Sequence, residues 1–127
     1  TERGLRKYTS FNAWAVRALL QDAISRNDNS TFNTQGLEAL NFVMNHLQNS
    51  TNHGLYHWVL QNGSLPDKSH WTFNNSVYQI GTYQAWMILA MIEVYNFTLN
   101  TTLLDWSKEI ANFLITYLWD SKTFDFQ

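Results

Sequence analysis

The segment between residues 53 and 78 holds many of the side chains that could take part in chemistry. It carries three histidines (His53, His57 and His70) and one acid, Asp67, which follows the single proline in a stretch rich in turn-forming residues. A histidine beside Asp67 would form an acid–base pair, because imidazole and carboxylate groups exchange protons readily near neutral pH. Histidine is more often an ordinary surface residue, so both interpretations stay open.

Three aromatic residues follow Asp67 in the same segment, namely Trp71, Phe73 and Tyr78. Aromatic rings suit the apolar faces of sugar rings, which makes these residues candidates for carbohydrate binding. We place His57 with them as a candidate polar contact to the same ligand. The alternative is that the three rings pack between the loop and the next helix, as aromatic residues commonly do.

Other kinds of site have little support. The ten acidic residues include no adjacent pair, and most fall on predicted helix surfaces or turns where they are solvated. The chain has no cysteine, and its histidines lack the His-Glu-x-x-His spacing of a zinc site. The glycines do not form a phosphate-binding loop. We therefore predict no metal and no cofactor.

An internal repeat defines the elements that must position these residues. Residues 11–20 match residues 83–92 at an offset of 72, and residues 38–47 match residues 109–118 at an offset of 71. Two separate segments that keep nearly the same period indicate a repeated supersecondary unit.

Each unit is predicted to be a helical hairpin. The first segment is apolar almost all round, which indicates an inner helix buried on every side. The second has apolar residues at helical spacing with polar residues between them, which indicates an outer helix with one solvated face. Trp14 and Trp86 occupy equivalent positions, for which we predict core packing. We expect inner helices near residues 10–25 and 77–96 and outer helices near residues 35–48 and 102–119.

Paired inner and outer helices predict an all-α fold, with two hairpins of an α/α toroid or solenoid. We expect a single region over residues 1–127 that contains two repeats, at about residues 8–72 and 73–127. A matching exit turn follows each outer helix, and residues 53–60 are expected to form a short strand or an extended loop. The second repeat stops partway, so we expect the chain to belong to a larger toroid or array, packed against neighbouring hairpins or copies of itself.

Charge and composition narrow the partners and suggest a compartment. A net charge of −2 offers no electrostatic basis for binding nucleic acid or an anionic membrane, and no apolar run reaches the ~20 residues of a membrane-spanning helix. Asn-x-Ser/Thr sites are frequent, whereas the content of Asn, Ser and Thr would give about two by chance. We therefore expect a secreted, extracellular or cell-wall glycoprotein. The six sites are Asn29, Asn49, Asn62, Asn74, Asn96 and Asn100.

One stretch of the sequence resembles a hallmark of the family-76 glycoside hydrolases, which are α-1,6-mannanase-like proteins. It consists of Trp71-Thr72-Phe73-Asn74, followed by a predicted inner helix that leads on to Tyr95-Asn96-Phe97-Thr98. The resemblance covers roughly residues 35–120. Tyr8-Thr9-Ser10-Phe11-Asn12 also resembles, more weakly, a motif in the toroid of certain thioredoxin-domain proteins. Both families share a six-hairpin (α/α) toroid with the N-acylglucosamine epimerases, and the resemblance implies that fold and a carbohydrate partner.

The chain departs from the family-76 pattern where catalysis is concerned. That family is implied to use an adjacent Asp-Asp pair, which this sequence lacks, and glycoside hydrolysis needs two facing carboxyl groups. If any activity is present, the resemblance favours Asp67 as the acid or base, because toroid families place their clefts at this loop face. Asn75 and Ser76 stand where the family has Gln-Gly, and a glycan on Asn74 would exclude that residue from a tight cleft.

Two functions are therefore open. The chain is either part of a carbohydrate-active or carbohydrate-binding toroid, or a noncatalytic extracellular repeat such as a tandem array or filament subunit. Whether it is an enzyme is undecided at this level, because no catalytic pair of carboxylates is visible in it.

Overall fold

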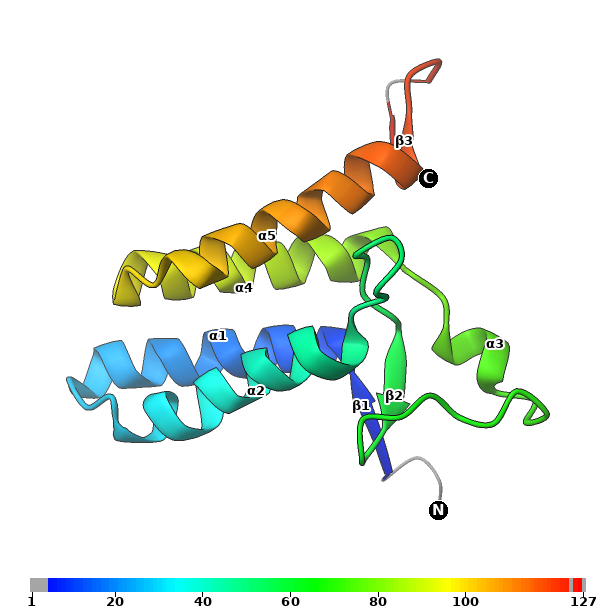
Figure 1. The fold of residues 1–127 in the computed structure, drawn as a ribbon. Helices are drawn as coiled ribbons and strands as arrows, with labels where there is room; N and C mark the ends of the chain where they lie inside the picture. Colours follow the sequence, from blue (N-terminus) through cyan, green and yellow to red (C-terminus); the bar gives the residue numbers. More distant parts are fainter. Residues whose placement is uncertain (1–4, 124, 127) are drawn as a thin grey trace.

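The computed structural model describes residues 5–123 and 125–126, and within them the chain is mainly helical (Figure 1). The all-α hairpin fold predicted from the sequence is confirmed. The inner helices are α1 (Thr9–Arg26) and α4 (Gly81–Thr98). The first outer helix comprises η2 (Phe32–Gly36), α2 (Leu37–Phe42) and η3 (Val43–Leu47), and the second comprises α5 (Thr101–Phe113) and η4 (Leu114–Leu118). The short elements are β1 (Arg6–Tyr8), β2 (Trp58–Leu60), α3 (Phe73–Ser76), β3 (Trp119–Asp120) and β4 (Asp125–Phe126).

The two hairpins repeat in detail. Helices α1 and α4 are both 18 residues long and begin 72 residues apart. Each ends at a residue in the left-handed conformation, Asn27 with φ 53° and Leu99 with φ 58°, which closes the last turn. Both outer helices finish in a five-residue π-helical turn, η3 and η4, and these turns begin 71 residues apart. The predicted offsets therefore describe the backbone as well as the sequence.

The repeat continues through the turns after the outer helices. Gln48 forms an isolated antiparallel β-bridge with Leu55. At an offset of 71 residues, Trp119 pairs antiparallel with Phe126. The Oδ1 atom of Asn49 accepts the N–H of Thr51 at 2.8 Å, and Asp120 accepts the N–H of Lys122 at the same distance. The matching exit turns predicted from the sequence are present in both units.

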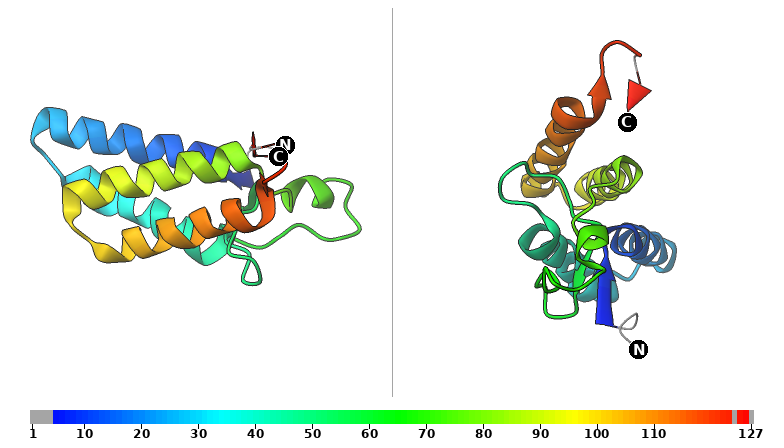
Figure 2. Two further views of the ribbon diagram at one scale, coloured as in Figure 1. Left: turned by 90° about the horizontal axis from the view of Figure 1, so that it is seen from above. Right: turned by 90° about the vertical axis from the view of Figure 1, so that its right-hand side faces the viewer.

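The helices form two layers (Figure 2). The inner helices α1 and α4 lie side by side and run in the same direction, while the outer helices return along the other layer. The core between the layers is apolar, and its largest buried side chains include Leu20, Phe32, Leu40, Met87 and Met91. The N-terminal ends of both inner helices therefore meet at one end of the molecule, beside the long connecting segment.

Burial of the inner helices is less complete than the sequence predicted. On α4, Leu89 is 42% exposed and Ile92 is 36% exposed, because they lie on a side that no element of the described chain covers. Trp86 is partly buried and packs against the core, as predicted. The prediction of core packing is wrong for Trp14, which is 51% exposed on α1.

Buried polar side chains fix the connecting segment to the inner helices. Gln84 on α4 is fully buried, where its Oε1 atom accepts the N–H of Leu55 at 2.7 Å and its Nε2 atom donates to the Leu55 carbonyl at 2.8 Å. At the start of α1, the Thr9 hydroxyl donates to the Tyr56 carbonyl at 2.6 Å. Strand β2 then pairs antiparallel with β1, so residues 55–60 are anchored to both hairpins.

Replacing Gln84 should loosen this anchor. We expect Gln84→Leu to lower the free energy of unfolding by about 2–4 kcal/mol, because the buried N–H and carbonyl of Leu55 both lose their partner. Its repeat counterpart Asn12 is partly buried and makes one bond, from Nδ2 to the Tyr8 carbonyl at 2.7 Å, so Asn12→Leu should cost about 1 kcal/mol or less. Chemical denaturation measures both variants. Equal losses would contradict the special role of Gln84.

Candidate functional site

Six aromatic rings form a continuous row across the two hairpins, which we call the aromatic row. In order, the centroids of neighbouring rings lie 4.9, 5.4, 5.4, 5.3 and 5.5 Å apart. These spacings are those of rings in contact. The row follows the N-terminal parts of both inner helices, with its ends more exposed than its middle. Its members are Phe11, Tyr8, His57, Tyr83, Trp86 and Trp14.

His57 joins the two halves of the aromatic row. Its backbone N–H donates to the Tyr78 carbonyl at 2.7 Å and to the Ser76 carbonyl at 3.1 Å, and its own carbonyl accepts the N–H of Thr9 at 3.1 Å. Its Nδ1 atom lies 3.0 Å from the Oδ1 atom of Asn75, within hydrogen-bonding distance. These bonds hold His57 between the start of α1 and the segment that precedes α4.

The Trp14 end of the aromatic row reaches an ion pair that links the inner helices. The Nε and Nη2 atoms of Arg17 each donate to a different carboxylate oxygen of Glu93 at 2.9 Å. The Arg17 guanidinium also lies 5.0 Å from the centre of the Trp14 ring. Hydrogen bonding to Glu93 raises the pKa of Arg17, which keeps this group cationic. About a quarter of each charged side chain is accessible, so the pair is open to a ligand.

This arrangement suits binding better than hydrolysis. Apolar rings beside fixed hydrogen-bonding groups are what a sugar site requires. Glycoside hydrolysis needs two facing carboxyl groups. Glu93 is the acid linked to the aromatic row, through Arg17, and Arg17 donates a hydrogen bond to each of its two carboxylate oxygens. No cluster of three His, Asp or Glu side chains that could hold a metal ion occurs in the described part of the chain.

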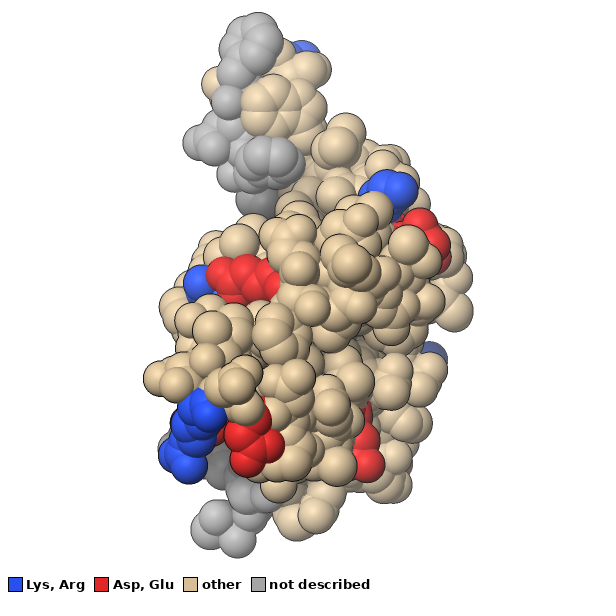
Figure 3. Space-filling view, turned by 90° about the vertical axis from the view of Figure 1, so that its left-hand side faces the viewer, with Lys and Arg blue, Asp and Glu red and all other residues tan. Residues whose placement is uncertain are grey.

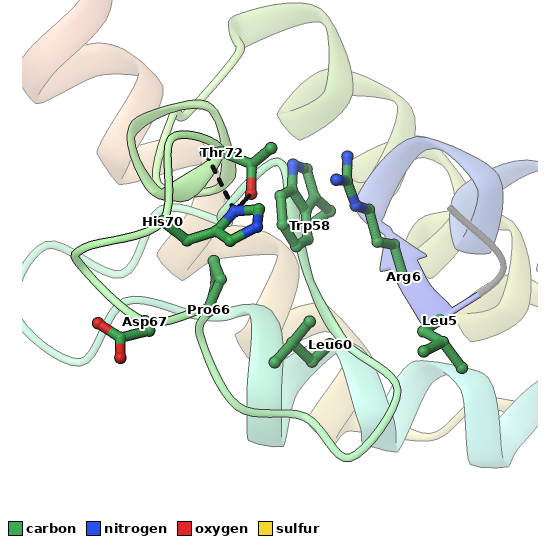
Figure 4. A pocket seen from close by; sticks show the side chains of 8 residues that line it. All are labelled: Leu5, Arg6, Trp58, Leu60, Pro66, Asp67, His70 and Thr72. Atoms are coloured by element: carbon green, nitrogen blue, oxygen red, sulfur yellow. Dashed lines mark hydrogen bonds between the residues drawn. The ribbon is translucent and has the colours of Figure 1, made fainter. Parts of the chain in front are cut away.

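Asp67 lines a separate pocket of about 230 Å³ (Figure 4). The His70 ring faces Trp58 across the pocket, with its Nδ1 atom 2.6 Å from the Thr72 hydroxyl, while the Asp67 carboxylate points away from the pocket. The Arg6 guanidinium lies over the Trp58 ring, 4.2 Å from its centre. The lining residues are Leu5, Arg6, Trp58, Leu60, Pro66, Asp67, His70 and Thr72.

Local hydrogen bonds define the state of Asp67. Its Oδ1 atom accepts both the N–H and the hydroxyl of Ser69, each at 2.9 Å. These bonds lower the pKa of Asp67, first through the backbone N–H, and the nearby His70 adds a smaller effect in the same direction. The carboxylate is fully exposed and ionised at neutral pH, which is the state of a base and not of a general acid.

The other predicted sugar-binding residues are divided between two places. His57 lies within the aromatic row, and the Tyr78 carbonyl binds its N–H. Trp71 is 81% exposed and stacks on His70, with ring centres 6.0 Å apart, so it belongs to the side of the Asp67 pocket. Phe73 begins α3 and is partly buried, and Tyr78 is 56% exposed.

Sequence reasoning overlooked Tyr8, Phe11 and Tyr83 and placed Trp14 in the core. The repeat itself carried a usable signal. Phe11 is the counterpart of Tyr83, as Trp14 is of Trp86, so both inner helices present aromatic residues three positions apart at their first turns. Residues three apart share a helix face, and two parallel helices bring such faces together.

Five of the six predicted glycosylation sites are exposed, at Asn29, Asn62, Asn74, Asn96 and Asn100. Asn49 is partly buried, so it is the least accessible of the six. Asn29, Asn96 and Asn100 belong to the end of the hairpins opposite the aromatic row. The surface of that end carries few charged side chains, which are of both signs (Figure 3). No helix in residues 5–123 or 125–126 is long and apolar enough to cross a membrane.

Comparison with known proteins gives a likeness of fold. No protein-family model and no curated protein matches the sequence. Among solved structures, the cellobiose 2-epimerase of Spirochaeta thermophila matches with a TM-score of 0.80 at 17% identity, over 96% of this chain and 28% of that protein. The cellobiose 2-epimerase of Bacillus thermoamylovorans matches with a TM-score of 0.77 at 18% identity, over 96% and 29%.

These two epimerases are (α/α)6 toroid proteins, and the chain spans less than a third of their length. At such low identity the match shows the fold, and that fold is part of a six-hairpin toroid. The predicted fold of repeated helical hairpins is therefore confirmed. The finer resemblance to family-76 glycoside hydrolases stays a prediction.

The state of Asp67 can be tested by removing one of its hydrogen bonds. We expect Ser69→Ala to raise the pKa of Asp67 towards its ordinary value, because the hydroxyl that stabilises the charged form is lost while the backbone N–H stays. Because the folded-state pKa is depressed, any stability that Asp67 contributes is present above its unfolded-state pKa and is lost as the pH falls through the folded-state value.

The pKa of the Asp67 carboxyl group is measured by NMR titration. Asp28 is the internal control, because its pKa is lowered in the same way by Ser30. The pKa of Asp28 should not change in Ser69→Ala. An unchanged pKa of Asp67 would show that the Ser69 hydroxyl does not stabilise the carboxylate.

Proposed function

We propose that the two hairpins form one wall of a carbohydrate-binding cleft in an α/α toroid, with the aromatic row as the surface on which sugar rings stack. The observation that supports this most is the unbroken row of six rings across both inner helices. Aromatic faces bind the apolar faces of pyranose rings, and a row offers successive places for linked sugars. The fold match to cellobiose 2-epimerases, proteins named for action on a disaccharide, agrees with this proposal.

Polar groups beside the aromatic row would select a neutral sugar. The imidazole of His57 can form a hydrogen bond with a hydroxyl group, while Arg17 and Glu93 offer donors and acceptors without a net charge. Tyr78 is included in the proposal as a contact beside the aromatic row, because its carbonyl is bonded to His57. Trp71 and Phe73 stay proposed sugar contacts apart from the aromatic row, with Trp71 stacked on His70 beside the Asp67 pocket.

Catalysis, if it occurs, would need groups supplied by further hairpins. Asp67 is our candidate for a base, since it is ionised at a pocket edge, but its carboxylate points away from that pocket. The described residues place one acid, Glu93, at the aromatic row. We therefore propose that the chain by itself binds sugar and does not hydrolyse it at a useful rate.

We also propose that the protein is a secreted or cell-wall glycoprotein. Five exposed Asn-x-Ser/Thr sites support this, since a glycan attached there would extend into solvent. The alternative function, a noncatalytic structural repeat, is favoured by the uncovered apolar side of α4 at Leu89 and Ile92, where a further hairpin would fit.

Sugar binding should depend on the aromatic row. In an NMR titration of the isolated chain with cellobiose and with α-1,6-mannobiose, the indole N–H signals of Trp14 and Trp86 should shift. Tyr83→Ala should weaken binding about tenfold, because one stacked ring is removed from the middle of the aromatic row.

The matched control is Tyr117→Ala, which removes a 58% exposed tyrosine from η4. It should leave the affinity unchanged, and circular dichroism verifies the folding of both variants. Shifts confined to Trp71, or equal effects of the two variants, would move the site away from the aromatic row.

Glycosylation should be visible in material secreted by a eukaryotic host. We expect an intact mass above that of the polypeptide, which falls after treatment with an N-glycosidase, and deamidated asparagines that map to the exposed sites. Asn49 should be the least occupied, because its side chain is partly buried and caps a turn. A mass equal to that of the polypeptide would refute the glycoprotein proposal.

A further inference from the structure

A groove of about 300 Å³ lies between the two outer helices, and we call it the outer groove. One wall belongs to α2, and the other to the residue before α5 and its first turns. Figure 2 shows both outer helices in the same layer. Both walls are therefore present whatever precedes or follows the two hairpins, and the volume is that of a small ligand site.

The most deeply buried residues that line the outer groove are apolar. Leu40 of α2 is 1% exposed and Leu103 of α5 is 2% exposed. Leu37 and Trp106 also line the groove, and each packs against the core while part of it stays accessible. An indole ring with an accessible side can stack on the apolar face of a sugar ring.

The other residues that line the outer groove are exposed, polar and uncharged, namely Asn41, Asn100 and Thr102. The Oδ1 atom of Asn100 accepts the N–H of Thr102 at 3.1 Å, and its carbonyl accepts the N–H of Leu103 at 3.2 Å. These bonds fix Asn100 at the edge of the groove. They do not use its Nδ2 atom, which is the atom that carries an N-linked sugar.

We propose that the outer groove holds the first N-acetylglucosamine of a glycan attached to Asn100, with the sugar ring against Trp106 and the acetamido group near Asn41. This inference rests on the glycoprotein proposal above. The segment Asn100-Thr101-Thr102 is an attachment sequence, and the asparagine that carries the sugar is itself part of the groove. A neutral sugar also suits a groove whose lining residues carry no charge.

The position of Trp106 on α5 brings its ring within reach of that sugar. Residues three or four apart share a helix face, so Trp106 lies on the same face as Thr102 and Leu103. It follows Asn100 by six residues, or about 9 Å along the helix axis. Helix side chains tilt towards the N-terminus, which shortens the distance between the indole and Asn100. The docked sugar would then join α5, to which it is attached, to α2.

The first measurement is the release of glycans by an N-glycosidase from folded protein that a eukaryotic host has secreted. We expect release from Asn100 to be at least tenfold slower than from Asn62, and equal after denaturation. Asn62 is the matched site, because it is exposed and its Oδ1 atom also accepts the N–H two residues later, at 3.0 Å from Ser64. It does not line the outer groove.

The second measurement is the contact itself. After an endoglycosidase has trimmed each glycan to one N-acetylglucosamine, NMR should show nuclear Overhauser effects between the sugar on Asn100 and the indole of Trp106. Asn41→Tyr should abolish them and restore fast release from Asn100, because a larger side chain fills the groove. The control is Asn45→Tyr, the same change at an exposed asparagine of η3 outside the groove, and circular dichroism verifies both folds.

Each outcome decides the proposal. Contacts to Trp106 and slow release that are lost in Asn41→Tyr and kept in Asn45→Tyr support it. Missing contacts, or a release rate that Asn41→Tyr does not change, overturn the docking and leave the glycoprotein proposal standing. An unoccupied Asn100 also overturns it, whereas a chain without any glycan refutes both. No free sugar is added, so these results are separate from the test of the aromatic row.

Discussion

An inner helix that is apolar around its whole circumference must be covered on every side, and the rest of the structure follows from that constraint. Helix α4 has no charged residue before Glu93. An outer helix covers one side of it, and α1 covers the next. Burial of such a surface stabilises a protein by about 25 cal/mol per Å², so the sides that lack a neighbour are the sides from which further packing would gain most. The two hairpins satisfy the constraint in part and leave it unsatisfied at both outer edges.

The same constraint determines where polar chemistry can occur. Polar groups within the packed region must be paired, and Gln84 and Thr9 show this by binding the backbone of residues 55 and 56. These bonds hold His57 against the N-terminal ends of both inner helices, where it links the two halves of the aromatic row. A site that is already ordered loses little conformational freedom on binding, which favours affinity.

The sequence allowed the hairpins to be predicted but not the aromatic row. Helix positions followed from the offsets of 72 and 71, because a repeated pattern of apolar residues is a local property that can be read along the chain. The contact of Tyr8 with His57, and of His57 with Tyr83, joins residues far apart in sequence and depends on how β1, β2 and α4 meet. Asp67 was noticed for its residue type, but the direction of its carboxylate is set by Ser69, which composition alone does not reveal.

The proposed division between binding and catalysis follows from how an α/α ring is built. In the proposed toroid, each hairpin would contribute the end of one inner helix to the centre, so the two described hairpins would supply neighbouring parts of one wall. Hydrolysis of a glycosidic bond requires groups on both sides of the sugar, about 5–10 Å apart. Stacking requires one side only, which is the role proposed for the aromatic row. A ring completed by other hairpins would bring a facing surface to Glu93 and His57, and its chemistry would then depend on residues contributed across the centre.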